Sequence, residues 1–547
     1  ADQERRRLFG DGFVSIFSLF RDGRELASRL REVRSMPSAE QADGLAAITD
    51  PYLVFFDETD LCPHTGLRLM DVWRYFRHTW ANQYTSVPGR TMMFLVRDRA
   101  APRHPVVGIG SISSPIVQIR ERDIWIGWHP ESLLEEIQER PTAKHGKWLK
   151  GIVGQALDEL YVQDFLEESD ADHLLTPSEL QDPTPDVIER LRAHARKHRE
   201  LHQQYPDQNE HKGVEGGRVA TGTWEDRARS NLFISKRAAA LADLLEARRD
   251  LATHLGERPT KDEVAALARD RSMQRTLLKV FRKAKADRVG VAMADITVCG
   301  AIPPYGALLG GKLVSLLAGS PELVAAYRKR YSGAESEIAS AMAGRAIKRP
   351  AELVFLGTTS LYGRSAQYNR VRMPGEQLGG EPGTELRFVP LGESEAYGTS
   401  HFSAETLRLF DAVLRRSERG QRVNNIFGEG TSPKLRKVRD GLSHLGFPVA
   451  LLKHHRRREL YGVPLASNLK EYLIGMSPRP RYLFPRAGAE STSAISAWWR
   501  ERWVSKRLHS DQVLESVETH TLTSPIRHGA RIQLPPEHPD RLDPFNE

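Results

Sequence analysis

The residues that most clearly suggest chemistry lie in Ile296–Ser320, which reads ITVCGAIPPYGALLGGKLVSLLAGS. Its first residues are apolar and small or β-branched, as in a buried strand, and Pro303 and Pro304 then interrupt both a strand and a helix. From Lys312 onward the apolar residues follow helical spacing, so the sequence predicts a strand, a glycine-containing turn and a helix. Free backbone N–H groups at such a helix start suit an anion such as a pyrophosphate, and glycine lets the ligand approach the backbone.

Several kinds of turn share this pattern. Gly306-x-x-x-x-Gly311-Lys312-Leu313 nearly spells a P-loop, but Leu313 stands where a magnesium-binding Ser or Thr belongs. A Rossmann fingerprint needs three spaced glycines directly after the strand, and this spacing is absent. A buried strand–helix turn, with glycines for close packing only, is a further interpretation.

The segment Ile302–Leu313 resembles the acyl-CoA-binding motif of the GNAT acetyltransferases. In that family a V-x-P-x-Y/R segment ends the fourth strand, and a Gly-x-Gly/Ala turn caps the next helix. Ala307 departs from the pattern, because the family has Arg or Gln there. The resemblance implies acyl-CoA as a candidate cofactor. The cofactor-binding residues that it implies are Ile302, Tyr305, Leu309, Gly310, Gly311 and Lys312.

Two tyrosines are the candidate catalytic residues, in the segment TTSLYGRSAQYNR that follows a predicted strand at Leu353–Thr358. In the GNAT family a short helix with A-x-x-x-Y-x-x-x-G-F follows the fifth strand, and a tyrosine there can protonate the departing CoA thiolate. Ala366–Val371 takes a similar place here, without the terminal Gly-Phe. By this resemblance Tyr368 is the better candidate and Tyr362 the second. A half-buried tyrosine with a satisfied hydroxyl is the alternative. Arg364 and Arg370 are candidate phosphate ligands, or solvated arginines.

Basic residues are concentrated in residues 412–460. The whole chain has a net charge of +8, and this window holds twelve Lys or Arg residues against four acids, so it alone has the same excess. Ser432 and Pro433 predict a capped helix start, and a basic run before Tyr461 predicts a strand, as on a winged-helix-like surface. We predict that this region binds nucleic acid, with DNA as the first candidate; a solvated charged face is the alternative. The predicted contacts are Lys434, Arg436, Lys437, Arg439, Arg456, Arg457 and Arg458.

Other reactive groupings are weak. Asp57, Glu58 and Asp60 follow a predicted strand, as carboxylates do in metal nucleases, but no matching His or Lys accompanies them. The chain has only 2 cysteines, which excludes a cysteine-based zinc site and makes a disulfide framework implausible. No apolar run approaches the roughly 20 residues that span a bilayer. We therefore predict no metal site and no membrane partner, and we expect a cytoplasmic protein.

The length of 547 residues and the change of pattern along the chain predict several units in an α+β fold. Strand patterns at 51–128 (RDIWIGW at 122–128 included) and 289–373 predict one GNAT-like mixed sheet, flanked by helices. Amphipathic helical patterns between them predict a helical insertion, and Pro374–Gly398 is predicted as a surface loop. The predicted units are an N-terminal helical region at 1–50, the first half of the GNAT-like core at 51–130, the insertion at 131–288, the second half of the core at 289–410 and a basic C-terminal region at 411–547.

Five segments in order, across roughly residues 122–474, resemble the DruA family of the Druantia anti-phage systems. They are RDIWIGW, CGAIPPYGALLGGKLVSLL, TTSLYGRSAQYNR, VNNIFGEGTSPKLRKVRDGL and YGVPLASNLKEYL. The resemblance implies a role in bacterial defence beside a helicase and other partners, and it implies no particular reaction. We therefore predict a nucleic-acid-binding defence component with a degenerate GNAT-like core, which the unusual Ala307 favours. The alternative is an acyl-CoA- or nucleotide-dependent transferase that uses the Gly310–Gly311 turn and Tyr368.

Overall fold

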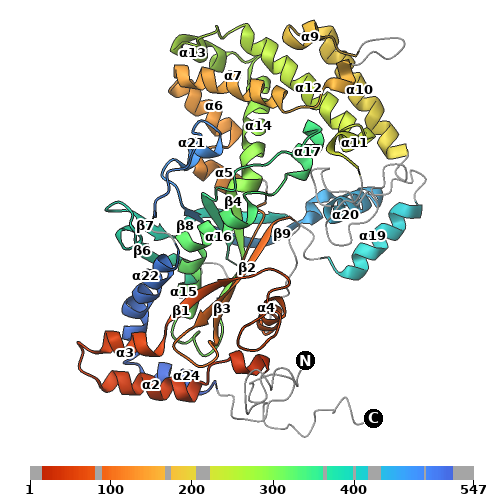
Figure 1. Ribbon diagram of the computed structural model, residues 1–547. Helices are drawn as coiled ribbons and strands as arrows, with labels where there is room; N and C mark the ends of the chain where they lie inside the picture. Colours follow the sequence, from red (N-terminus) through yellow and green to blue (C-terminus); the bar gives the residue numbers. More distant parts are fainter. Residues whose placement is uncertain are drawn as a thin grey trace.

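In the computed structural model, a seven-stranded mixed sheet forms the centre of the molecule (Figure 1). The structure describes residues 15–80, 89–116, 118–166, 174–204, 222–360, 366–397, 402–416, 433–485 and 488–520. The sheet order is β1-β2-β3-β4-β5-β9-β8. These strands are β1 (Pro51–Phe55), β2 (Thr91–Asp98), β3 (Val106–Ser113), β4 (Met293–Ala301), β5 (Phe355–Thr359), β8 (Val389–Tyr397) and β9 (Lys453–Pro464). Strands on either side of the long helical segment thus share one sheet, which confirms that prediction.

The pairing of β4 with β5 differs from all the other pairings in this sheet. These two strands run parallel, whereas every other neighbouring pair is antiparallel. Their ladder covers only the pairs from Met293–Phe355 to Asp295–Gly357. Beyond Asp295, β4 continues beside β3 as far as Ala301 without further ladder pairs to β5. The edge of β4 that is left open leads directly to the candidate turn.

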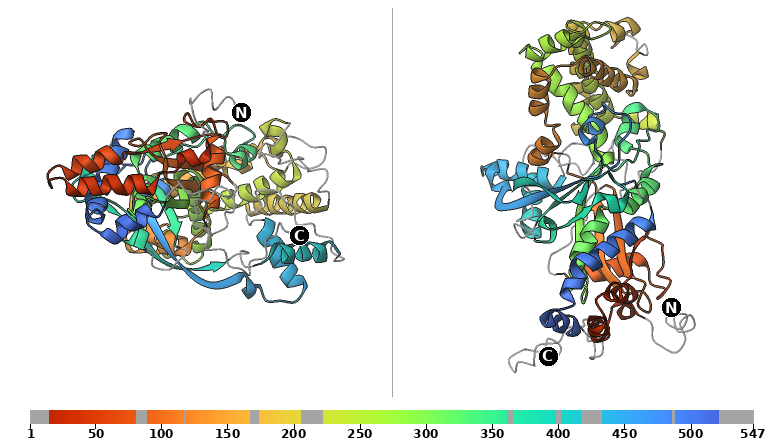
Figure 2. Two further views of the ribbon diagram at one scale, coloured as in Figure 1. Left: turned by 90° about the horizontal axis from the view of Figure 1, so that it is seen from below. Right: turned by 90° about the vertical axis from the view of Figure 1, so that its left-hand side faces the viewer.

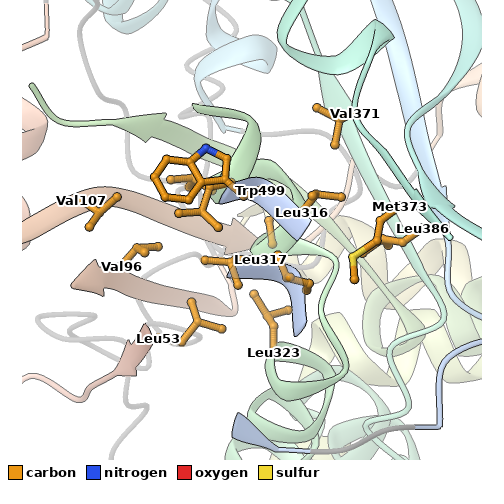
Figure 3. Packing of buried hydrophobic residues seen from close by; sticks show 14 of the residues in the cluster. Leu53, Val96, Val107, Leu316, Leu317, Leu323, Val371, Met373, Leu386 and Trp499 are labelled. Atoms are coloured by element: carbon orange, nitrogen blue, oxygen red, sulfur yellow. The ribbon is translucent and has the colours of Figure 1, made fainter. Parts of the chain in front are cut away.

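Side chains alternate along the strands and give the sheet two different faces. On one face Val96 and Leu53 pack with Leu316, Leu317 and Trp499 in a continuous core (Figure 3). The helical elements around this core are α2 (Gly23–Ser35), α3 (Gln41–Ile48), α15 (Gly310–Ala318), α16 (Pro321–Tyr331), α22 (Ala489–Trp499), η5 (Arg500–Val504), α23 (Ser505–Arg507) and α24 (Asp511–Glu518). On the other face, η1 (Ile16–Leu19) and α4 (Leu69–His78) cover β1 to β4. Each fully buried large apolar side chain contributes about 1.5–3 kcal/mol, so this packing fixes α15 against the sheet.

A block of helices stands on the sheet at the top of Figure 1. Its members are α5 (Arg120–Ile126), α6 (Pro130–Glu139), α7 (Ala143–Asp158), α8 (Gln163–Leu166), α9 (Pro177–Gln181), α10 (Pro185–Gln204), α11 (Trp224–Ala228), α12 (Asn231–Ala252), α13 (Lys261–Arg269) and α14 (Gln274–Ala292). Trp148, Leu241 and Phe281 lie in its own core, and α14 continues directly into β4. The helical pattern predicted for 131–288 is thereby confirmed.

The remaining elements lie around the sheet and against the helical block. They are α17 (Glu337–Ala343), α18 (Ala366–Asn369), β6 (Arg372–Pro374), η3 (Gly375–Leu378), β7 (Glu385–Arg387), α19 (Ala404–Arg416), α20 (Pro433–His444), η4 (Val449–Leu452) and α21 (Leu469–Leu473). Strands β6 and β7 form a separate two-stranded sheet. None of the helices in the described ranges is long and apolar enough to cross a membrane.

Two predictions of local structure are wrong. Arg122–Trp128 is not a strand, because α5 covers Arg120–Ile126 and ends at Gly127 in a left-handed conformation. The Asp123 carbonyl accepts the N–H groups of Gly127 and Trp128, so the apparent alternation belongs to a helix end. Pro374–Gly398 is not one loop, since it contains η3, β7 and the whole of β8. The position of β8 at the edge of the sheet explains its polar composition.

The segment beyond residue 411 is closely joined to the sheet. Strand β9 lies between β5 and β8, with Phe355 opposite Pro464 and Thr359 opposite Leu460. Further along, α22 packs on β1, and the Ser496 hydroxyl donates to the Pro51 carbonyl at 3.0 Å. The C-terminal segment therefore completes the core on which the candidate sites are built.

Candidate functional site

The predicted turn lies where β4 ends and α15 begins. Helix α15 starts at Gly310, directly after Leu309 in a left-handed conformation with φ of 59°, which confirms the predicted helix start. The Gly310 N–H donates to the Tyr305 carbonyl at 2.9 Å, and the Lys312 N–H donates to the Leu309 carbonyl at 2.9 Å. An anion that binds these two N–H groups must therefore displace hydrogen bonds within the turn.

The glycines of the turn differ in what surrounds them. A Cβ atom on Gly310 would lie 2.9 Å from the Tyr305 carbonyl oxygen and 3.0 Å from the Ala301 Cβ, so packing of the chain itself requires glycine there. A Cβ atom on Gly311 would meet the Gln367 side chain at 3.4 Å, which is close to ordinary contact. Close packing alone thus accounts for Gly310, in agreement with the interpretation of this segment as a buried strand–helix turn.

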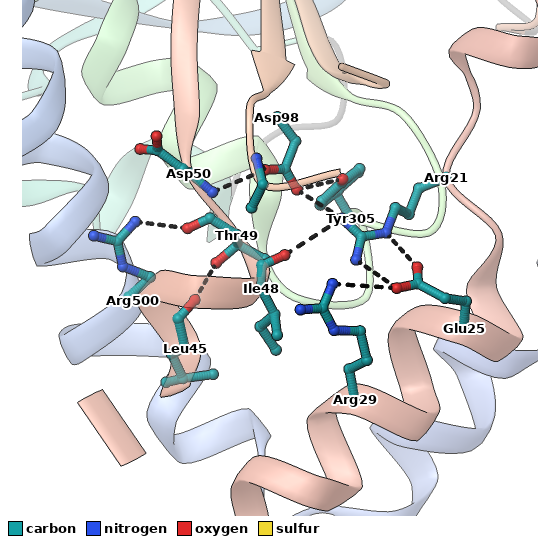
Figure 4. Close-up of polar contacts among 11 residues, drawn as sticks. Arg21, Glu25, Arg29, Leu45, Ile48, Thr49, Asp50, Asp98, Tyr305 and Arg500 are labelled. Atoms are coloured by element: carbon teal, nitrogen blue, oxygen red, sulfur yellow. Dashed lines mark hydrogen bonds and ion pairs between the residues drawn. The ribbon is translucent and has the colours of Figure 1, made fainter. Parts of the chain in front are cut away.

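Tyr305 is held in a buried polar cluster (Figure 4). Its hydroxyl donates to Asp98 at 2.7 Å, and Arg21 donates to the same Asp98 oxygen at 3.2 Å. The other Asp98 oxygen accepts the Asp50 N–H at 2.8 Å, and Arg21 also pairs with Glu25 at 2.7 Å. Burial, followed by the Asp98 charge, raises the pKa of Tyr305 well above its ordinary value, so the phenol keeps its proton. The predicted cofactor contact is therefore a link between the turn and β2.

The other predicted cofactor-binding residues lie in different surroundings. The Ile302 side chain is fully buried beside α4, and the Leu309 carbonyl accepts the Trp499 indole N–H at 3.3 Å. The buried Lys312 ammonium lies 5.7 Å from the centre of the Trp503 ring. Burial lowers the pKa of Lys312, and the positive charges of Arg370 and Arg507 lower it further. Three cations from separate elements thus gather near the start of α15.

Tyr368 and Gln367, both on α18, lie at the open edge of β4. The Tyr368 ring stacks on Phe388, with 4.8 Å between ring centres. Burial is the main cause that raises the pKa of Tyr368, so the hydroxyl keeps its proton, as a general acid requires. Gln367 donates to the Cys299 carbonyl at 3.3 Å and to the Ser315 hydroxyl at 3.0 Å, and so it bridges β4 and α15. Tyr362 lies outside the described residues.

The predicted basic surface lies on a projection of the sheet. Strand β9 pairs with β5 only from Leu460 onward, whereas it pairs with β8 as far back as Lys453. The hairpin therefore extends beyond the sheet, and α19 and α20 are inserted between its two strands (Figure 2). These helices share a small core of Phe410, Val438 and Leu442. The predicted order of helix, turn and basic strand is confirmed, while Ser432 lies outside the described residues.

The structure describes only three of the seven predicted nucleic-acid-binding side chains. Lys437 pairs with Asp411 of α19 at 2.8 Å, so it ties the two inserted helices together. The Arg439 side chain lies 3.5 Å from Asp440 and is exposed. Arg458 is half-buried on β9. Of the remaining four, Lys434 and Arg436 belong to α20 and Arg456 and Arg457 to β9, and only their backbone is described.

Sequence reasoning missed a second buried charge cluster, beneath α5. The Asp123 carboxylate accepts from Arg122 at 2.9 Å, from the Trp128 indole at 2.9 Å and from the Lys285 ammonium. All four side chains are buried. Lys285 lies 162 positions away from Asp123, and no pattern along the chain signals that pairing.

The fold and the site together define an α+β protein. Its mixed sheet has a tightly bonded glycine turn at the end of the central strand β4, and a hairpin at one edge of the sheet carries two helices with basic residues. The sequence profile of the family described as "Druantia protein DruA" matches residues 67–139 and 268–475, which is more than half of the chain. The chain therefore belongs to the DruA family. The unmatched residues between these ranges belong to the helical block.

A curated relative supports the same family. The chain is 32% identical over 209 residues to the "Druantia protein DruA" of Escherichia coli (strain UMEA 4076-1). The aligned part covers 38% of this chain and 48% of that protein, so the chain spans about half the length of the relative. No solved structure matches the chain.

Proposed function

We propose that the protein is a component of a Druantia anti-phage defence system and binds nucleic acid through its basic hairpin. Family membership supports the first part of this proposal. We place the protein in the cytoplasm beside other subunits of the system, such as a helicase, and we retain the predicted division into core, helical insertion and basic region.

We further propose that the sheet is a GNAT-like core. The glycine turn and α15 follow β4, the fourth strand of the chain, and α18 with Tyr368 follows β5, the fifth strand. These are the places where the resemblance puts the cofactor turn and the tyrosine. The helical block enters between β3 and β4, as an insertion into such a core would.

One observation carries the nucleic-acid proposal. The window with the chain's whole charge excess contains the end of α19, all of α20 and most of β9, and β9 with β8 forms a hairpin that extends past the sheet. A projecting basic element presents its cations to a polyanion without burying them in the core, where desolvation would oppose them. A duplex or a single strand is the partner that this charge suits best.

Salt dependence of binding tests the proposal. We would replace Lys434, Arg436 and Arg439 with Ala and retain Lys437, because its ion pair with Asp411 joins α19 to α20. Each lost duplex phosphate contact flattens the slope of log affinity against log salt by roughly 0.9, so a change of up to about 3 is expected.

The matched control replaces three exposed cations of the helical block, Lys144, Lys147 and Arg258, with Ala. This control should keep the wild-type slope on a labelled duplex and on a labelled single strand. If the α20 variant and the wild type bind equally at every salt concentration, the basic hairpin is only a solubilising surface.

The alternative is an acyl-CoA- or nucleotide-dependent transferase, and the cations Lys312, Arg370 and Arg507 favour it. An acyl-CoA phosphate near α15 would relieve the mutual repulsion of these three side chains. The internal hydrogen bonds of Gly310 and Lys312 oppose it, since an anion must displace them. Such a cofactor would bring the thioester chemistry, while Tyr368 would hold the proton for the departing thiolate. Calorimetry with acetyl-CoA and with ATP distinguishes the two functions. Heat of binding with the wild-type protein supports the transferase, and no heat with either ligand excludes it.

A further inference from the structure

Helix α5 presents large apolar side chains to solvent. The exposed fractions are 63% for Ile116, 43% for Ile124 and 39% for Trp125. We call these three residues the α5 platform. Ile116 belongs to it because its carbonyl accepts from Arg122 of α5 at 2.8 Å, which holds the preceding loop against the helix.

The platform is held rigidly from below. The buried Asp123 carboxylate pairs with Arg122 of α5 and with Lys285 of α14, and it accepts the Trp128 indole N–H. Asp295 of β4 accepts the Ile116 N–H at 3.0 Å. Burying this many charged groups costs free energy of desolvation, so the cluster serves to fix the orientation of α5 more than to stabilise the core.

The platform lies on the hairpin that carries the basic window. The Trp125 ring centre is 6.0 Å from that of Phe355 on β5, and a Cβ atom on Gly392 of β8 would lie 3.4 Å from Glu121 of α5. Tyr461 of β9 packs against Tyr368 on the opposite face of the sheet. Because side chains alternate along a strand, Arg458 lies on the same face as α5.

We propose that the α5 platform binds unpaired bases of a nucleic-acid strand, with one base stacked on Trp125 and neighbouring phosphates at Arg458 and at Arg120, the exposed first residue of α5. This inference rests on the proposed nucleic-acid binding, and it specifies single-stranded nucleic acid as the ligand of this surface. An aromatic side chain and cations on one face of a protein are the combination by which proteins hold single strands without reading their sequence. Three residues are too few for a stable protein interface, which takes about 20–30 residues from each partner.

Binding of labelled oligo-dT, oligo-U and a duplex of equal length to the full chain tests the inference. Trp125→Ala should weaken single-strand binding by about 5- to 100-fold and leave duplex binding unchanged, because duplex bases are already stacked. Trp125→Phe should retain part of the affinity. The control is Ile338→Ala on α17, which removes an apolar side chain that is 52% exposed and should change nothing.

A second measurement guards against indirect effects. A photoreactive thiouracil in the single strand should crosslink to Trp125, and the position is read by mass spectrometry of the digested complex. If Trp125→Ala binds oligo-dT and oligo-U like wild type while the α20 variant loses affinity, the platform proposal is overturned and the proposed function stands. If no nucleic acid binds at all, both are overturned. Equal losses on duplex and single strands would also refute stacking at Trp125.

Discussion

Replacing Gly310 and Gly311 of the β4–α15 turn by alanine, one at a time, tests whether these glycines serve close packing or ligand approach. A Cβ atom on Gly310 would lie 2.9 Å from the backbone carbonyl of Tyr305, which cannot swing aside as a flexible side chain would. Overpacking of this kind costs about 1–3 kcal/mol. On Gly311 the same atom would meet only the Gln367 side chain at 3.4 Å, and Gly→Ala in a helix gains about 0.4–1 kcal/mol.

We therefore expect Gly310→Ala to lower the free energy of unfolding by about 1–2 kcal/mol and Gly311→Ala to leave it equal or raise it slightly. Urea denaturation followed by circular dichroism measures the unfolding free energy. Hydrogen exchange of the α15 amides measures the local opening that the clash should promote. Gly306→Ala is the control within the same turn, because no atom outside its chain neighbours lies within 4 Å of a Cβ there.

One result would refute this reasoning. If Gly310→Ala is as stable as wild type and both alanine variants weaken binding of acetyl-CoA or ATP, the glycines exist for ligand approach. The internal hydrogen bonds of the turn would then be a closed form that a ligand opens, and the transferase would become the better account.

Two further predictions concern the buried pair Tyr305 and Asp98 and the half-buried His194 of α10. Tyr305→Phe removes one donor to Asp98 and should cost about 1–2 kcal/mol of unfolding free energy. Asp98→Ala leaves Glu25 as the remaining ion-pair partner of Arg21 and should cost about 2–4 kcal/mol. Urea denaturation of both variants gives the order, and a reversed order contradicts the prediction. Burial, with the charges of His198 and Lys197, lowers the pKa of His194 from 6.5 to about 4. The unfolded chain therefore takes up this proton first, so the stability from neutral His194 is complete above pH 6.5 and is lost as the pH falls toward 4. His194→Gln should lose less stability than wild type between neutral pH and about pH 5, and equal losses would show that His194 does not titrate in this way.

Local patterns were enough to predict most elements of the core. The strand pattern predicted at 51–128 contains β1, β2 and β3, and the helix predicted after the glycine turn is α15, which starts at Gly310. The reason is physical: uninterrupted apolar alternation suits a strand buried between two layers, and Pro303 and Pro304 leave few conformations between strand and helix. The order of helix and basic strand in α20 and β9 followed from equally local signals.

Contacts between distant residues decided the rest. Asp123 meets Lys285 across 162 positions and Tyr305 meets Asp98 across 207, so neither the buried ion pair of Asp123 nor the structural use of Tyr305 has a local signal. Composition marked the basic window, but only strand pairing placed β9 inside the core sheet and turned the window into a projecting hairpin. Residue types thus determined by themselves which segments form strands, helices and a cationic surface. Which side chains share a buried charge, and which face of the sheet Trp125 and Arg458 occupy together, depends on register and packing that exist only in the folded chain.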